Sequence, residues 1–201
     1  MTIFDETPTS DLRQRKRLAA MRRVQQHAVA LFTAHGFDAV TVEQVAAAAE
    51  VSPVSLYRWF GTKERLVLWD DYDPDLFAAV AARLSAQPPL EAVRDALVDE
   101  LGRIYDADRE LVLARTRLAH REPALVAAGS HDLRALHTAL TQLFGRAGPG
   151  RDPLEHEVLA ATCVGVLTTA ISRWQEEDGR RPLADHVVAG FEVLRRLSWT
   201  A

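Results

Sequence analysis

The sequence contains little cysteine and no long apolar run, and each shortage excludes a class of protein. One cysteine in 201 residues rules out a framework of intramolecular disulfides and a zinc finger built from several cysteines. No run approaches the roughly 18 consecutive apolar residues that span a bilayer. Residues 1–12 are polar and acidic and contain no apolar signal-peptide core, so we expect a cytoplasmic protein that does not enter a membrane.

Patterns that carry catalysis or bind metal ions are also scarce. The chain has no glycine-rich phosphate loop, and its seven histidines form neither an HExxH motif nor a pair four residues apart. An acidic cluster lacks the spacing of a calcium-binding loop: Asp70, Asp71, Asp73 and Asp75. Cys163 lies in an apolar helical pattern, which indicates a buried, unreactive thiol. We therefore expect no metal, no cofactor and no catalytic residue, and hence a protein that is not an enzyme.

The composition is typical of a soluble globular protein. The residues are 48% hydrophobic and 26% charged, and 201 residues suffice for one large domain or two small ones. A net charge of −4 taken alone argues against DNA binding, but residues 12–69 carry nine basic and only four acidic side chains. Six of those nine lie between Arg13 and Arg23. Such a cluster of basic side chains is typical of a surface that binds the phosphate groups of nucleic acid, although a solvated helix face would give the same pattern.

Apolar residues recur every three to four positions along the chain, and no segment alternates as a strand would. We therefore predict an all-α protein with one domain over 12–69 and a second over 70–201. The first would hold a long helix ending at His35, two short helices and a fourth helix beginning at Lys63. In the second we predict helices over 74–86, 89–107, 109–119, 122–128, 131–146, 153–177 and 183–198.

The two short helices are joined by a tight turn, which is the helix-turn-helix arrangement. The first begins after Thr41, whose hydroxyl can cap it while Gln44 completes a capping box. The second covers Pro53–Phe60, with Ser52 as its cap and proline at its first position. In helix-turn-helix proteins the second of these helices enters the major groove of DNA.

This segment resembles the N-terminal DNA-binding domain of the TetR family of bacterial transcriptional regulators. The matching residues are Leu31-Phe32, Gly36-Phe37, Thr41, Val45-Ala46, Val51-Ser52, Leu56-Tyr57, Phe60 and Lys63-Glu64. Glu50 departs from the family, which usually has glycine or another turn-tolerant residue there. If that position is left-handed, glutamate costs about 1 kcal/mol relative to glycine. The resemblance implies an N-terminal three-helix helix-turn-helix domain followed by a C-terminal helical domain for ligand binding and dimerisation.

The helix pattern and the resemblance together indicate one DNA-binding surface. Leu56 and Phe60 would face the core, and Arg58 is the candidate for reading a guanine. The resemblance assigns Lys63 to a phosphate contact. Alternatively, the two capping residues would serve as caps in any protein, and the tryptophan would only pack. The full set is Arg13, Arg15, Arg17, Thr41, Ser52, Pro53, Val54, Ser55, Tyr57, Arg58, Trp59 and Lys63.

The resemblance implies that the C-terminal domain dimerises and binds a small molecule. Its last two helices carry small and apolar residues that would form a four-helix bundle with a second subunit. These are Val158, Ala161, Thr162, Gly165, Val166, Thr169, Val187, Phe191 and Leu194. The candidate pocket residues are Leu101, Tyr105, Leu113, Arg117, His120, Leu140, Phe144 and Leu167. Plain packing of the monomer core is the alternative for both sets.

The predicted function is that of a homodimeric, ligand-responsive regulator of transcription. We expect a repressor that leaves double-stranded operator DNA when a small, largely hydrophobic effector binds, although an activator would share these features. The stretch 70–74 resembles a subgroup of the family that senses acyl-coenzyme A or related lipids. The alternative class is a helical small-molecule-binding protein or enzyme without operator binding, against which the basic residues near the N-terminus argue.

Overall fold

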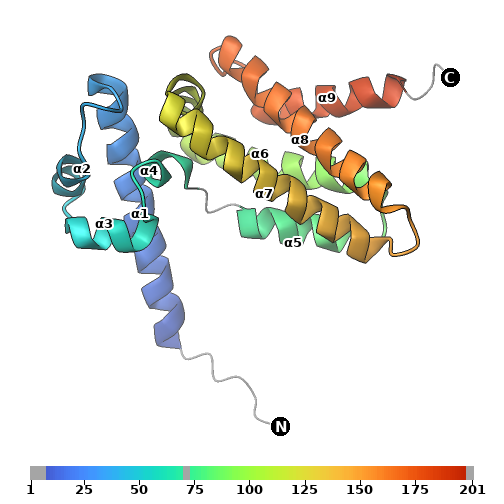
Figure 1. The fold of residues 1–201 in the computed structure, drawn as a ribbon, viewed down its shortest axis with the longest axis horizontal. Helices are drawn as coiled ribbons and strands as arrows, with labels where there is room; N and C mark the ends of the chain where they lie inside the picture. The colour runs from blue at the N-terminus through green and yellow to red at the C-terminus, as the bar shows by residue number, and fades with distance from the viewer. Residues whose placement is uncertain (1–7, 70–72, 198–201) are drawn as a thin grey trace, which may run out of the picture. The chain divides into compact units, whose positions relative to one another are not determined.

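The computed structural model describes residues 8–69 and 73–197, and their side chains except at 8–11, 73–75 and 103–107. Over these residues the chain forms helices and turns without a strand, which confirms the predicted all-α class (Figure 1). The chain divides into two compact units between residues 71 and 72. The helices are α1 (Pro8–His35), α2 (Val42–Ala48), α3 (Pro53–Phe60), α4 (Arg65–Leu68), α5 (Asp73–Arg83), α6 (Pro89–Arg121), α7 (Pro123–Ala147), α8 (Pro153–Glu176) and α9 (Leu183–Leu197).

The first unit is built on the long helix α1. Helices α2 and α4 pack against α1, and α3 packs against α2. The side chains of Val24, Phe32, Val45 and Leu56 are almost completely buried where these helices meet. Helix α1 ends at its predicted residue because Gly36 has a φ of +89°, in the left-handed region that glycine enters without a steric penalty.

The helix-turn-helix is organised by local hydrogen bonds at its helix ends. Thr41 Oγ1 accepts from Gln44 N at 3.2 Å, and Gln44 Oε1 accepts from Thr41 N at 2.8 Å, so the predicted capping box is confirmed. Ser52 Oγ accepts from Ser55 N at 3.2 Å and caps α3, as predicted. These bonds fix where both short helices begin without any contribution from the second unit.

Helix α4 begins later than predicted. It begins at Arg65 rather than at Lys63, because residues 62–64 form a turn in which Arg65 N lies 3.4 Å from Thr62 Oγ1. Its end is held by Gln25 of α1, whose Nε2 donates to Val67 O at 3.2 Å and to Trp69 O at 2.8 Å. Gln25 is buried in the core of the unit, so this pair of bonds locks α4 onto α1.

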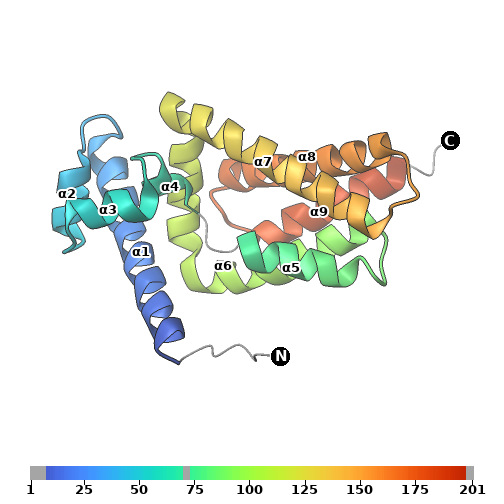
Figure 2. The ribbon, with the colours of Figure 1, turned by 60° about the horizontal axis from the view of Figure 1, so that its bottom comes forward.

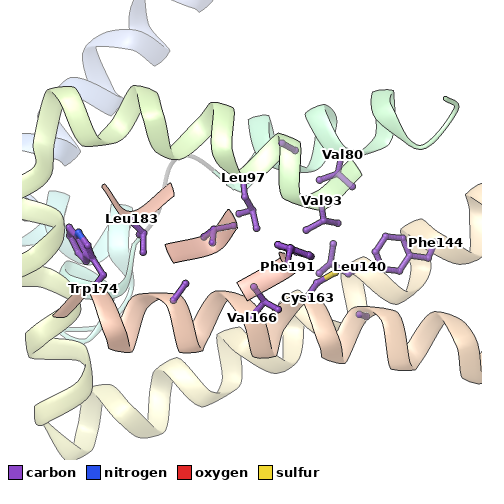
Figure 3. Packing of buried hydrophobic residues seen from close by; sticks show 14 residues of the cluster. Val80, Val93, Leu97, Leu140, Phe144, Cys163, Val166, Trp174, Leu183 and Phe191 are labelled. Carbon is purple, nitrogen blue, oxygen red and sulfur yellow. The ribbon is translucent and has the colours of Figure 1, made fainter. Parts of the chain in front are cut away.

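The second unit is a bundle of the five helices α5–α9 (Figure 2). Helix α8 packs against α6, α7 and α9, and α6 also packs against α5 and α9. Figure 3 shows the core between these helices, where Val93 and Leu97 of α6 meet Cys163 of α8 and Phe191 of α9. Trp174 is buried at the end of α8 and donates from Nε1 to Arg181 O at 3.0 Å, which fixes the turn into α9.

Of two helix breaks predicted in this unit, one appears as a kink and the other is absent. The predicted break at residue 108 appears as a kink inside α6, where Asp108 has non-helical dihedrals (φ −138°, ψ 23°). The predicted break at Gly129 is wrong, because α7 continues through it from Pro123 to Ala147. A glycine inside a helix costs about 1 kcal/mol relative to alanine, which the packing of Leu125 and Leu140 into the bundle offsets.

Helix α8 has an apolar composition on more than its buried side. Within the residues that the structure describes, it is the one helix whose length and mean hydropathy would allow it to cross a membrane. Six of its side chains are nevertheless buried, namely His156, Ala160, Cys163, Val166, Ala170 and Trp174, and all but His156 belong to the bundle core. Helix α8 is therefore the central helix of the bundle and does not indicate a membrane protein.

Candidate DNA-binding surface and effector cavity

Helix α3 presents a distinct outer face. Leu56 and Phe60 are buried, with exposed fractions of 1% and 7%, as the sequence predicted. Val54 and Tyr57 are exposed at 74% and 51%, and Arg58 and Pro53 are also exposed. The structure thus brings these four side chains together on one side of the helix, while Ser55 and Trp59 are half-buried beside them.

The hydroxyl residues near α3 form local bonds that limit what they can offer to DNA. Ser52 Oγ donates to Ser55 Oγ at 3.0 Å in addition to capping α3, so its proton is already used. The Thr41 hydroxyl accepts a bond within the capping box, which leaves its own proton available to an acceptor such as a phosphate oxygen. Thr41 is exposed and keeps this capacity, whereas Ser52 acts chiefly as a cap.

The Lys63 ammonium makes contacts within the protein that its sequence position does not indicate. Its Nζ donates to Phe37 O at 2.5 Å and lies 4.5 Å from the ring centroid of Phe37 and 5.5 Å from that of Phe32. These contacts tie the turn before α4 to the end of α1. The side chain is half-buried, so a phosphate contact would share the ammonium with these partners.

The basic residues of α1 lie on its exposed surface. Arg13, Arg15, Lys16 and Arg17 are all exposed, and two of them, Arg13 and Arg17, are one helical turn apart. A cluster of positive charge on a helix attracts the phosphate backbone of nucleic acid without reading its sequence.

Glu50 occupies the left-handed position in the turn between α2 and α3. Its φ is +56°, and the flanking bonds run from Val51 N to Ala46 O at 3.0 Å and from Glu50 N to Ala47 O at 3.2 Å. This is the Schellman arrangement, in which glycine is the usual residue at the left-handed position. The turn is therefore formed as in a glycine-containing turn, but at a steric cost.

The predicted dimer residues separate into two sets. Val158 is 55% exposed, and Ala161, Gly165 and Thr169 are also exposed on the same side of α8, while Thr162 and Leu194 are half-buried. The prediction is wrong for Val187 and Phe191, which are buried in the core of the single chain at 6% exposure or less, whereas Val166, at 8% exposure, also lines an open groove between α8 and α9. Val187 and Phe191 pack α9 into the bundle, so these two side chains are not available to a partner.

The predicted pocket residues do not form one pocket. Leu140 and Leu167 line a cavity of about 60 Å³, with further walls from Leu76, Phe77, Val80, Val93, Leu97, Leu136, Cys163 and Val164. Phe144 lines a different cavity, and Leu101 and Leu113 are half-buried against the core. The Tyr105 side chain lies outside the described residues.

The two polar residues predicted for the pocket lie elsewhere. Arg117 forms an ion pair with Asp178 in the turn after α8, and His120 is exposed with Nδ1 2.8 Å from Thr116 O. Neither lines this cavity, so their predicted role in holding an anionic group stays a prediction.

Two structurally important polar residues were not singled out from the sequence. Gln25 interrupts an apolar stripe that includes Met21, Ala28 and Phe32, and a polar residue in such a stripe is a usable signal of a buried hydrogen bond. Arg109 donates from Nε and Nη2 to Gly179 O at 2.9 and 2.7 Å, a contact between residues 70 apart that no local pattern encodes. Within the described residues, no group of three or more histidine, cysteine, aspartate or glutamate side chains could hold a metal ion.

Comparison with known proteins agrees with this architecture in both units. Residues 26–68 match the family described as bacterial regulatory proteins, tetR family, and residues 87–197 match the MftR C-terminal domain. The transcriptional regulator TcmR of Streptomyces glaucescens is 37% identical over 123 residues, which cover 58% of this chain and 54% of TcmR. The chain therefore matches only about half the length of TcmR.

A second relative and a solved structure extend over more of the chain. The putative mycofactocin biosynthesis regulator MftR of Mycobacterium tuberculosis is 25% identical over 184 residues, covering 90% of this chain and 91% of MftR. The structure of Thermus thermophilus FadR in complex with lauroyl-CoA has a TM-score of 0.53 at 21% identity, covering 87% of this chain and 92% of FadR. With a helix-turn-helix unit and a helical second unit both matched, the chain belongs to the TetR family of bacterial transcriptional regulators.

Proposed function

We propose that this regulator is a homodimeric repressor that binds double-stranded operator DNA through α3 and releases it when a small, largely hydrophobic effector binds the second unit. The observation that carries the proposal is the outer face of α3, where Arg58, Tyr57 and Val54 are exposed on a helix whose other side is locked in the core. Residues 12–69 would form the DNA-binding domain and 70–201 the effector-binding and dimerisation domain.

DNA recognition would divide between the sequence-reading helix and its charged surroundings. Arg58 can form two parallel hydrogen bonds with guanine, and Tyr57 can donate to phosphate or contact a thymine methyl group. The exposed basic residues of α1, together with Thr41 and the half-buried Lys63, would contact the phosphate backbone. Arg58 would therefore set sequence preference, whereas the basic residues of α1 would set affinity at a given salt concentration.

Dimerisation would use the side of α8 and α9 that the bundle leaves uncovered. Val158, Val193 and Leu197 are exposed at 55%, 44% and 66%, and small residues between them allow a close approach of helices. A second copy of the chain would cover this apolar surface with its own α8 and α9, in the self-complementary manner of a two-fold interface. Two recognition helices would then reach successive major grooves, about 34 Å apart.

The effector would enter the apolar core of the second unit. The cavity lined by Leu140 and Leu167 holds about 60 Å³, while pockets for small molecules usually hold about 300–1,000 Å³. An effector must therefore displace helices to fit, and α5, which supplies Leu76, Phe77 and Val80 to the cavity, follows the DNA-binding unit directly in the chain. The junction 70–74 that favoured an acyl-coenzyme A ligand lies outside the residues whose side chains are described.

The proposal is tested by fluorescence anisotropy with DNA from upstream of the protein's own gene. We expect saturable binding by the full-length chain that weakens steeply as salt rises, with two chains per duplex by sedimentation. Arg58→Ala changes the outer face of α3, and its matched control is Arg146→Ala, at an exposed arginine of α7, which should leave DNA binding unchanged. Absence of binding at low salt would favour the alternative, a helical small-molecule-binding protein or enzyme without operator binding.

A further inference from the structure

Lys63 lies in the turn that directly follows helix α3. The helix ends at Phe60, and Gly61 is its C-cap, whose backbone N donates to Tyr57 O at 2.9 Å. Only two residues separate Phe60 from Lys63. Contacts that fix the Lys63 side chain therefore act close to the C-terminal end of α3.

The Lys63 ammonium is bound by residues at the end of α1. Its Nζ donates to Phe37 O at 2.5 Å and lies 4.5 Å from the ring centroid of Phe37 and 5.5 Å from that of Phe32. Both rings are buried, and their centroids are 4.9 Å apart. The ammonium thus combines a charge-assisted hydrogen bond with attraction to two aromatic rings, and its half-buried position strengthens both interactions.

The two ends of α3 are anchored differently. At its start, Ser52 caps the helix and Leu56 N donates to Ser52 O at 3.2 Å. At its end, the buried Phe60 ring meets the Trp69 ring edge-on, with centroids 5.8 Å apart. Lys63 adds a polar contact between this end and α1, the helix that carries the exposed basic residues.

We propose that Lys63 is a positioning residue for sequence recognition: its ammonium holds the C-terminal end of α3 against the end of α1 and thereby orients Arg58. Arg58 lies only two residues before Phe60. The paired hydrogen bonds of an arginine with guanine require a defined approach of the guanidinium, so a rotation of α3 lowers specificity. The inference rests on the proposed DNA-binding role of α3, and it holds whether or not other N–H groups of Lys63 also reach a phosphate.

The first test measures specificity by fluorescence anisotropy of the full-length chain. The two probes are the duplex from upstream of the protein's own gene and a duplex of the same composition in scrambled order. Lys63→Met keeps the aliphatic chain but removes the charge and the donor, and it should lower the ratio of the two affinities about tenfold. Loss of a phosphate contact alone would weaken both duplexes equally, so an unchanged ratio in Lys63→Met would overturn the proposal.

Two further variants calibrate this ratio. Lys16→Met removes the charge of an exposed lysine of α1 and should weaken both duplexes equally, which leaves the ratio unchanged. Lys63→Arg keeps the charge and the donors and can stack on aromatic rings, so it should restore most of the ratio. Loss of the ratio in Lys63→Arg to the level of Lys63→Met would contradict the role of the ammonium.

The second test uses hydrogen exchange without DNA. In Lys63→Met the Gly61 amide, at the end of α3, should exchange about tenfold faster than in the parent, whereas the Leu56 amide, near its start, should keep its rate. Equal acceleration of both amides would show a general loss of stability in the unit and would overturn a local role at the end of α3.

The parent chain offers a third test that needs no variant. Lys16 and Lys63 are its only lysines, and Lys16 is exposed. Mild acetylation without DNA, followed by peptide mass spectrometry, should modify Lys63 about tenfold more slowly than Lys16, because Lys63 Nζ is hydrogen-bonded and half-buried. Equal rates would overturn the proposal. Failure of the parent to bind either duplex would instead contradict the proposed function, while exchange and acetylation would still test whether Lys63 holds the end of α3.

Discussion

Replacing Glu50 by glycine should stabilise the helix-turn-helix by about 1 kcal/mol. The left-handed backbone at φ +56° costs an L-residue about 1–2 kcal/mol, and glycine removes this cost. Glycine also loses more conformational entropy on folding, which offsets part of the stabilisation. The Glu50 side chain is exposed, so little packing is lost on its removal. The hydrogen bond from Val51 N to Ala46 O closes the same turn and reports on its opening.

The assay is hydrogen exchange of the Val51 amide in the full-length protein. A gain of about 1 kcal/mol corresponds to a roughly fivefold higher protection factor. Glu50→Gln is the matched control, because it removes the charge and keeps a side chain in the left-handed region. Equal protection in the glycine and glutamine variants would refute the argument that backbone strain at this position limits the stability of the turn.

Arg58→Ala should relax the sequence preference at one base position by about 1–3 kcal/mol, and an unchanged preference in a binding-site selection would contradict its base-reading role. Gln25→Leu should lower the free energy of unfolding by about 1–3 kcal/mol, because Val67 O and Trp69 O lose their donor. Thermal melts measure this, with the exposed neighbour Gln26→Leu as the control expected to melt as the parent does. Burial raises the pKa of the Cys163 thiol to about 12, so the thiol should resist Ellman's reagent at pH 8 in the folded chain and react once unfolded in urea. Reaction at the same rate in both states would show that the thiol is accessible.

Features governed by neighbouring residues were predictable from the sequence. The capping box of Thr41 and Gln44, the Ser52 cap and the Gly36 terminus each depend on at most four consecutive residues, and the structure contains all three. The inward positions of Leu56 and Phe60 follow from helical spacing alone, because both lie on one side of a short, straight helix.

Features that depend on how helices pack together were not predictable to the same degree. Helix α8 is apolar on more than one side, so spacing could not separate Val166, which packs in the monomer core, from Val158, which is exposed. The predicted pocket residues of α6 lie on both sides of the kink at Asp108, which interrupts the helical spacing between them. The hydrogen bond from Lys63 to Phe37 O joins residues 26 apart, so no local sequence pattern predicts it.

A DNase I footprint of the full-length protein on DNA from upstream of its own gene shows whether α3 of two chains reads operator DNA. We expect two protected segments whose centres are about one helical turn, or 34 Å, apart, and their loss in Arg58→Ala at the same protein concentration. A footprint retained in full by that variant, or no footprint at low salt, would contradict this role of α3.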